Sequence, residues 1–157
     1  MVMRTPTSFG VGELLFSSEF RIAPHEVAGW ELAQDLGDRD DRPNFRPRLE
    51  RPPVAGSPVP DGLVLVRALE AIERSRNLRG CTITPISAGR WRSFSPVIVG
   101  ERLTAVATVR YRSVHEPHAL TLAIELRSGA RKLAELIVSV EVGLATPTTY
   151  ASEFAAA

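Results

Sequence analysis

The sequence has very little cysteine and very little lysine. Cys81 is the single cysteine among the 157 residues, so the chain cannot form an internal disulfide. Lys132 is the single lysine, and since the chain has 19 basic residues, the remaining 18 are arginines. Schiff-base chemistry away from Lys132 is therefore not expected, and an anion-binding site would use planar guanidinium groups.

Three further features that would indicate another class of protein are missing. The sequence has no charged leader followed by an apolar stretch and no apolar run near the roughly 18 residues of a membrane helix, so we expect a cytoplasmic protein without membrane contact. The formal net charge of +1 excludes the overall basicity of a nucleic-acid-binding protein. With 44% hydrophobic and 24% charged residues, the composition fits one globular domain over residues 1–157.

The most unusual stretch that is present is a loop expected between residues 37 and 60. It begins with an acidic cluster, continues with arginines and is rich in proline: Pro43, Pro47, Pro52, Pro53, Pro58 and Pro60. Prolines remove backbone donors and forbid helix interiors, so this stretch predicts a long, stiff loop. Loops of this length inside compact domains are often functional.

A strand and two helices are predicted around this loop. Residues 13–22 have the pattern of a strand, and a helix begins at Pro24 and ends at Gly37. The apolar face of that helix consists of Val27, Trp30, Leu32, Ala33 and Leu36. A second helix opens at Pro60 and is apolar on nearly every side as far as residue 72, so we expect protein all around it.

The second half of the sequence changes to a period of two. Alternation over residues 103–111, 120–127 and 134–142 predicts three consecutive strands, joined by turns at 115–118 and 128–131, and strand signals also occur in 81–95. The prediction is an α+β fold, with a mainly antiparallel sheet of about five strands wrapped around one long buried helix. From about residue 146 to 157 we expect a frayed tail.

Three segments carry a resemblance to a known family. They are residues 28–41 (AGWELAQDLGDRDD), 57–72 (SPVPDGLVLVRALEAI) and 94–109 (FSPVIVGERLTAVATV). The last is the most specific, because it has an aromatic residue, Pro-Val, a short gap and Gly-Glu before the next strand. The chain resembles the MaoC-like enoyl-thioester hydratases and dehydratases, and this resemblance implies the hotdog fold.

The catalytic loop departs from the pattern of that family. The family's loop reads Gly-Asp-x-Asn-Pro-x-His, and its Asp and His activate water. In this sequence Asp38 is kept, Asp40 replaces the Asn, and Pro43 or Asn44 stands at the position of the histidine. The catalytic motif is therefore degenerate.

The second helix departs from the family as well. Asp61-Gly62 stands where the family has His-Gly, and Arg67 stands where the related acyl-carrier-protein dehydratases have a glutamate. Neither family's full acid/base pair is present.

Hydration of an enoyl thioester needs a base for water, an acid for the alpha carbon and donors for the enolate oxygen. Asp38 is the candidate base and Asp61 the candidate acid, because paired carboxylates can split their pKa values. Alternatively, Asp38 begins a turn and Asp61 caps the helix. Gly62 offers a backbone N–H at a helix N-terminus for the thioester oxygen, or else serves close packing.

The candidate substrate-binding residues are Asp40, Arg42, Arg46, Arg67, Arg90 and Trp91. The arginines suit the phosphates of a coenzyme A or phosphopantetheine arm. His115 and His118 flank a proline at a turn with no third ligand nearby, so we expect a solvated turn rather than a metal site, and no cofactor.

The expected function is therefore that of a lyase, a hydratase or dehydratase of an enoyl or 3-hydroxyacyl thioester in fatty-acid or polyketide metabolism. Two alternatives stay open: a non-catalytic acyl-binding subunit of a hetero-oligomeric hydratase, which the missing histidine favours, and a hotdog thioesterase. A homodimer or a hotdog hetero-oligomer is expected, since an isolated subunit leaves a sheet edge exposed. Coenzyme A or an acyl carrier protein would deliver the substrate.

Overall fold

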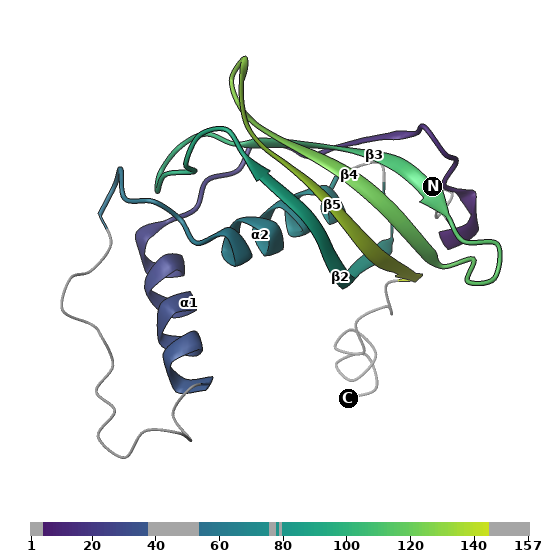
Figure 1. Ribbon diagram of the computed structural model, residues 1–157, viewed down its shortest axis with the longest axis horizontal. Coiled ribbons are helices and arrows are strands. Elements are labelled where there is room, and N and C mark those ends of the chain that lie inside the picture. The colour runs from purple at the N-terminus through teal and green to yellow at the C-terminus, as the bar shows by residue number, and fades with distance from the viewer. Residues whose placement is uncertain (1–4, 38–53, 76–77, 79, 145–157) are drawn as a thin grey trace, which may run out of the picture.

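The computed structural model describes residues 5–37, 54–75, 78 and 80–144. One five-stranded antiparallel sheet curves around helix α2 (Asp61–Glu73), and helix α1 (Pro24–Gly37) lies at one end of the sheet, beside the beginning of α2 (Figure 1). The predicted α+β class, with a sheet around one long helix, is confirmed.

The sheet has the strand order β1-β3-β4-β5-β2. Its strands are β1 (Leu14–Phe16), β2 (Cys81–Ser93), β3 (Thr104–Arg112), β4 (Ala119–Ser128) and β5 (Arg131–Leu144), preceded by a short 3-10 helix, η1 (Pro6–Ser8). Buried and less buried residues alternate along β3 and β4, as the period of two predicts. The buried set faces α2, and the other set forms the outer face of the sheet.

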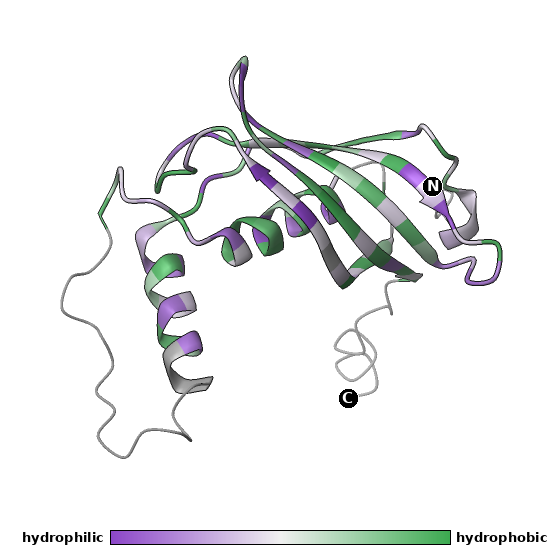
Figure 2. Cartoon of the chain, viewed as in Figure 1, coloured by the Kyte–Doolittle hydropathy of each residue, from purple (hydrophilic) through white to green (hydrophobic). Residues whose placement is uncertain are grey.

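The hydrophobic core lies between α2 and the concave face of the sheet. Figure 2 shows hydrophobic residues along α2 and along the strands that pass over it. The buried helix residues are Leu63, Val64, Ala68, Leu69, Ala71 and Ile72. The amphipathic pattern of the strands and the apolar pattern of the helix thus meet in one core.

Three details of the sequence prediction are wrong. The first strand is much shorter than residues 13–22, because Ser17 accepts a hydrogen bond from the Ala105 N–H through its side chain, and pairing resumes only as a single bridge from Phe20 to Leu103. On α1, Ala33 is exposed instead of packed. On α2, Leu65 is only half-buried, because a sheet covers a helix from one side.

Parts of two predictions lie outside the described residues. The loop prediction concerns residues 37–60, of which 37 and 54–60 are described. The tail prediction concerns residues 146–157, all of which lie outside the described residues. Among the described residues, no helix combines the length and hydrophobicity needed to cross a membrane.

Candidate active site

Three stretches that are distant in the sequence meet at the beginning of α2. The Val59 N–H donates to the Val97 carbonyl (2.8 Å), and the Val99 N–H donates to the Ser57 carbonyl (2.8 Å). The Gly100 N–H donates to the carbonyl of Ile22, just before α1 (3.0 Å). Residues 97–100 are therefore bonded both to the residues just before α2 and to the residue shortly before α1.

The first turn of α2 lacks a side-chain cap. Pro60 occupies the N-cap position and makes no side-chain hydrogen bond, so Asp61 is the first helical residue rather than the cap. The Val64 N–H is bonded to the Pro60 carbonyl (3.1 Å), whereas the amides before it have no intrahelical acceptor. Asp61 and Gly62 are both exposed, so an anionic oxygen could approach this positive helix end.

Gly62 packs directly against the indole of Trp30 on α1. A Cβ atom at position 62 would lie 2.6 Å from Trp30 Cζ2, which is closer than real carbon contacts allow. This contact supports the packing interpretation of Gly62, and it is compatible with a free N–H. Sequence reasoning placed Trp30 on an apolar face but did not connect it with the candidate site, because nothing local links the two residues.

Four candidate site residues lie outside the described residues: Asp38, Asp40, Arg42 and Arg46. They follow Gly37, the last residue of α1, whose first turns lie beside the start of α2 (Figure 1). Their roles stay predictions.

Arg67 ties α2 to α1. Its Nε lies 2.9 Å from Glu26 Oε1 and its Nη1 lies 2.9 Å from Glu70 Oε2, while Nη2 donates to the Arg21 carbonyl (3.4 Å). The side chain is only 18% exposed. A substrate that bound Arg67 would compete with two carboxylates for the same guanidinium group.

Trp91 and Arg90 lie on opposite faces of β2. Trp91 points inward and, with residues of α2 such as Val64 and Ala68, lines an apolar cavity of about 10 Å³, roughly the room of one water molecule. Its Nε1 is buried and has no hydrogen-bond partner among the described residues. Arg90 is on the outer face, away from α2, so the two residues cannot line one pocket within this subunit.

The histidines and the cysteine give no sign of a metal centre within the described residues. His25, His115 and His118 are exposed, and Cys81 is buried in the core. The described part of the chain contains no group of three or more His, Cys, Asp or Glu residues placed to hold a metal ion.

Comparison with solved structures identifies the architecture. A monoamine oxidase regulatory protein from Archaeoglobus fulgidus matches with a TM-score of 0.62 at 14% identity, covering 92% of this chain and 97% of that protein. An (R)-hydratase from A. caviae involved in PHA biosynthesis matches with a TM-score of 0.56 at 20% identity, covering 85% and 97%. The chain has the hotdog fold.

Another hotdog match is the fluoroacetyl-CoA-specific thioesterase FlK, with a TM-score of 0.54 at 16% identity, covering 87% of this chain and 90% of that protein. No protein-family model matches the chain, and no curated protein sequence matches it either. The resemblance to the MaoC-like hotdog proteins is thus confirmed at the level of the fold.

Proposed function

We propose that this chain acts on an acyl thioester, as a hydratase of an enoyl thioester or a dehydratase of a 3-hydroxyacyl thioester. The observation that carries the proposal is the uncapped, exposed first turn of α2 at Asp61 and Gly62, held between segments that resemble the MaoC-like family. The (R)-hydratase of the same fold supports this reaction class.

The reaction follows from three groups. The Asp38 carboxylate takes a proton from water, and the resulting hydroxide forms a bond to the beta carbon of the enoyl thioester. The electron pair of the double bond moves to the thioester oxygen, where the Gly62 N–H and the helix N-terminus stabilise the enolate. Asp61 then gives a proton to the alpha carbon, and dehydration is the same sequence in reverse.

An acyl chain placed between α2 and β2 would have to widen the cavity of about 10 Å³ beside Trp91. The unpartnered Trp91 Nε1 can donate to a polar group of the substrate, and the surrounding side chains are apolar. Arg42, Arg46 and Asp40 on the loop would then face the coenzyme A or carrier-protein arm. Arg67 would join this set by exchanging its ion pairs with Glu26 and Glu70 for the substrate. Arg90, on the outer face of the sheet, takes no part in this site.

Substitution of Asp38 tests the proposal. Asp38→Asn keeps the size of the side chain and removes the base, so turnover of enoyl or 3-hydroxyacyl thioesters should fall by about 10²–10⁴-fold. Asp41→Asn, a matched change in the same acidic cluster, should retain most of the activity. Equal activity of Asp38→Asn and the wild type across a panel of chain lengths would refute the assignment.

Two other functions have their own supporting observations. The catalytic loop lacks the family's histidine, with Pro43 or Asn44 at that position, which favours a non-catalytic acyl-binding subunit of a hetero-oligomer. That function predicts no turnover by the chain alone and recovery of activity with an intact hotdog partner.

The second alternative is thioester hydrolysis, for which one carboxylate is enough to activate water. The match to a fluoroacetyl-CoA-specific thioesterase of the same fold favours it. Release of free thiol from acyl-coenzyme A, without hydration of the enoyl substrates, would distinguish it. In each case we expect a cytoplasmic homodimer or hetero-oligomer.

A further inference from the structure

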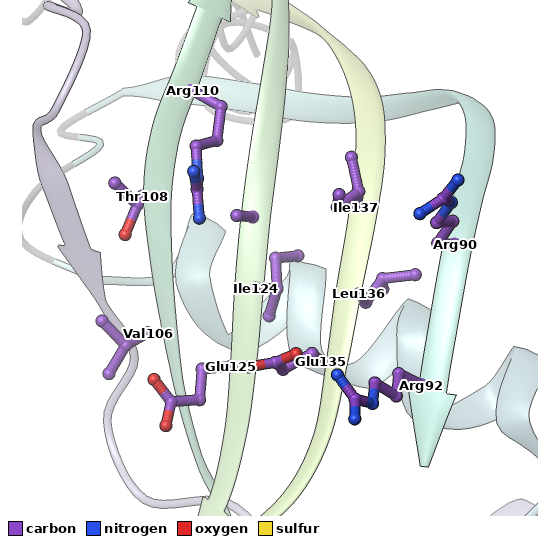
Figure 3. A pocket seen from close by; sticks show the side chains of 11 residues that line it. Arg90, Arg92, Val106, Thr108, Arg110, Ile124, Glu125, Glu135, Leu136 and Ile137 are labelled. Carbon is purple, nitrogen blue, oxygen red and sulfur yellow. The ribbon is translucent and has the colours of Figure 1, made fainter.

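The outer face of the sheet carries a groove of about 310 Å³ on the side opposite α2 (Figure 3). Its floor is made of small and apolar side chains that alternate with core residues along their strands: Val106, Ala123 and Ile137. Ile137 is 44% exposed. We call this feature the outer groove, and its volume is at the lower end of the range of small-molecule sites.

Two irregularities of the sheet place arginines in the outer groove. On β3, a register shift between Val109 and Tyr111 leaves Arg110 as an extra residue opposite β4. On β2, a shift between Ala88 and Trp91 sets Gly89 and Arg90 opposite the single residue Ile137 of β5. Bulges of this kind redirect side chains, and they are common next to functional sites.

Gly89 makes the second irregularity possible. A Cβ atom at this position would lie 2.7 Å from the Ile137 carbonyl oxygen, so only glycine allows β2 to approach β5 this closely. As a result, Arg90 and Arg110 lie on opposite sides of Ile137 (Figure 3).

In the described part of the chain neither arginine is held in an ion pair, although the charge of Arg110 acts on Glu135. Within the described residues, Arg90 and Arg110 make no ion pair and no hydrogen bond, whereas Arg102 pairs with Glu19 and Arg131 pairs with Glu101. The guanidinium groups on both sides of the groove are thus available to an external acceptor.

The acidic groups of the groove are already neutralised. Glu125 and Glu135 stand directly opposite each other on β4 and β5, and Lys132 forms ion pairs with both. Arg127 adds a second ion pair to Glu125 (2.5 Å). The hydrogen bond from Lys132, followed by the charges of Lys132, Arg92 and Arg110, holds the pKa of Glu135 below its usual value.

The remaining charge of the outer groove is therefore positive, from Arg90, Arg92 and Arg110. This charge argues against a second copy as the occupant, because a two-fold contact would bring like charges together. It favours an anion. The backbones of β2 and β3 are three strand spacings apart, roughly 14 Å, which suits a ligand with more than one anionic group.

We propose that the outer groove binds a small polyanion, a molecule with phosphate or carboxylate groups held between Arg90 and Arg110. Guanidinium forks bind both kinds of group in a bidentate manner. The floor formed by Val106, Ala123 and Ile137 receives the apolar part of the ligand. The site is on the opposite face of the sheet from α2, and its assignment does not depend on the proposed thioester chemistry.

Binding of pyrophosphate and of citrate, measured separately by calorimetry and by the shift of the thermal midpoint, tests this site for phosphate and for carboxylate ligands. We expect saturable binding of at least one of them, weakened about tenfold or more in the double variant Arg90→Gln/Arg110→Gln, because charged hydrogen bonds are lost. Arg102→Gln is the control, since it removes one guanidinium charge from another part of the surface, where Arg102 is 69% exposed.

A second variant separates shape from charge. Ala123→Leu fills the floor of the groove and keeps both arginines, so it should also abolish binding. Absence of saturable binding by the wild type, or an equal loss in Arg102→Gln, would overturn the proposal. Self-association of the wild type that is lost in Arg110→Gln would overturn it too, in favour of a second copy.

Discussion

The contact between Gly62 and Trp30 links the candidate active site to the packing of the two helices. Glycine is normally unfavourable inside a helix, because it loses more backbone entropy than alanine. At position 62 the absence of a Cβ atom leaves room for the indole ring of Trp30. A Cβ atom there would lie 2.6 Å from Trp30 Cζ2. The same residue can therefore serve packing through its Cα and substrate binding through its N–H.

Gly62→Ala should destabilise the protein by about 1–3 kcal/mol, because the methyl group forces Trp30 away from α2. Gly29→Ala is the matched control: Gly29 is also helical and has open space around it, so alanine there should stabilise the protein by up to about 1 kcal/mol. Urea denaturation followed by tryptophan fluorescence measures both changes. Equal stabilisation by the two substitutions would show that Trp30 does not restrict position 62.

At the level of the elements, the attachment of α1 to α2 depends on Glu26 and Arg67. Glu26 Oε2 accepts a hydrogen bond from the Ala23 N–H (2.7 Å) at the beginning of α1, and Oε1 pairs with Arg67 of α2. One carboxylate thus caps the first helix and holds the second. The sequence patterns do not predict the contacts of Glu26 with Ala23 and Arg67, because the periodicity of each helix depends only on residues of that helix.

A double-mutant cycle of Glu26→Gln and Arg67→Gln tests this attachment. We expect a coupling energy of about 0.5–3 kcal/mol in the free energy of unfolding, as is usual for residues in direct contact. Arg74→Gln, at the other end of α2, should show no coupling with Glu26→Gln. If thioester KM rises in Arg67→Gln but remains unchanged in Glu26→Gln, Arg67 binds substrate as well as holding the helices together.

At the scale of the whole molecule, strand β2 forms a long edge of the sheet. Only half of that edge is protected against pairing with another strand. The Cys81 N–H donates to the Leu78 carbonyl (2.9 Å), the Ile83 N–H donates to Glu73 Oε2 (3.0 Å), and Pro85 has no N–H. At these alternate positions of β2, the backbone N–H group is already bonded or is missing, so a second strand finds few donors to pair with. Within the described residues, no contact of this kind protects the half from Ser87 to Ser93.

We expect the chain to pair with a second subunit through the Ser87–Ser93 half of β2. Hydrogen–deuterium exchange over a protein concentration series should show added protection of residues 87–93 as the dimer forms. Residues 81–85 serve as the internal control and should exchange at the same rate at all concentrations. Concentration-independent exchange over 87–93, in a protein that is dimeric by light scattering, would exclude this edge as the interface.

Most of the elements could be predicted from local patterns. Both helices and the strands of the second half have nearly the expected bounds, because the period of hydrophobicity is a local property of the chain. The first strand was overestimated, since the side chain of Ser17 interrupts its pairing with β3. The prediction that α2 is buried on all sides is also too strong, since the apolar pattern of a helix does not show how many of its faces other elements cover.

The candidate site was less predictable than the fold. The sequence pattern and the resemblance identify Asp38, Asp61 and Gly62. The structure places the neighbouring residues Asp61 and Gly62 in the first turn of α2, whereas Asp38 lies outside the described residues. Arg67 and Arg90 were grouped as substrate-binding arginines, yet one is paired with carboxylates and the other is directed outward. A sequence does not distinguish these arginines, because the difference depends on neighbours from other strands and helices.

By itself, the sequence determined the order and type of the elements, the scarcity of lysine and cysteine, and the departure from the catalytic motif at Pro43 or Asn44. The tertiary structure alone decided that Trp30 packs against Gly62, and that bulges turn Arg90 and Arg110 toward one groove. The physical reason is that periodicity arises from neighbours along the chain. Contacts across the sheet and between helices join residues whose separation in the sequence carries no periodic signal.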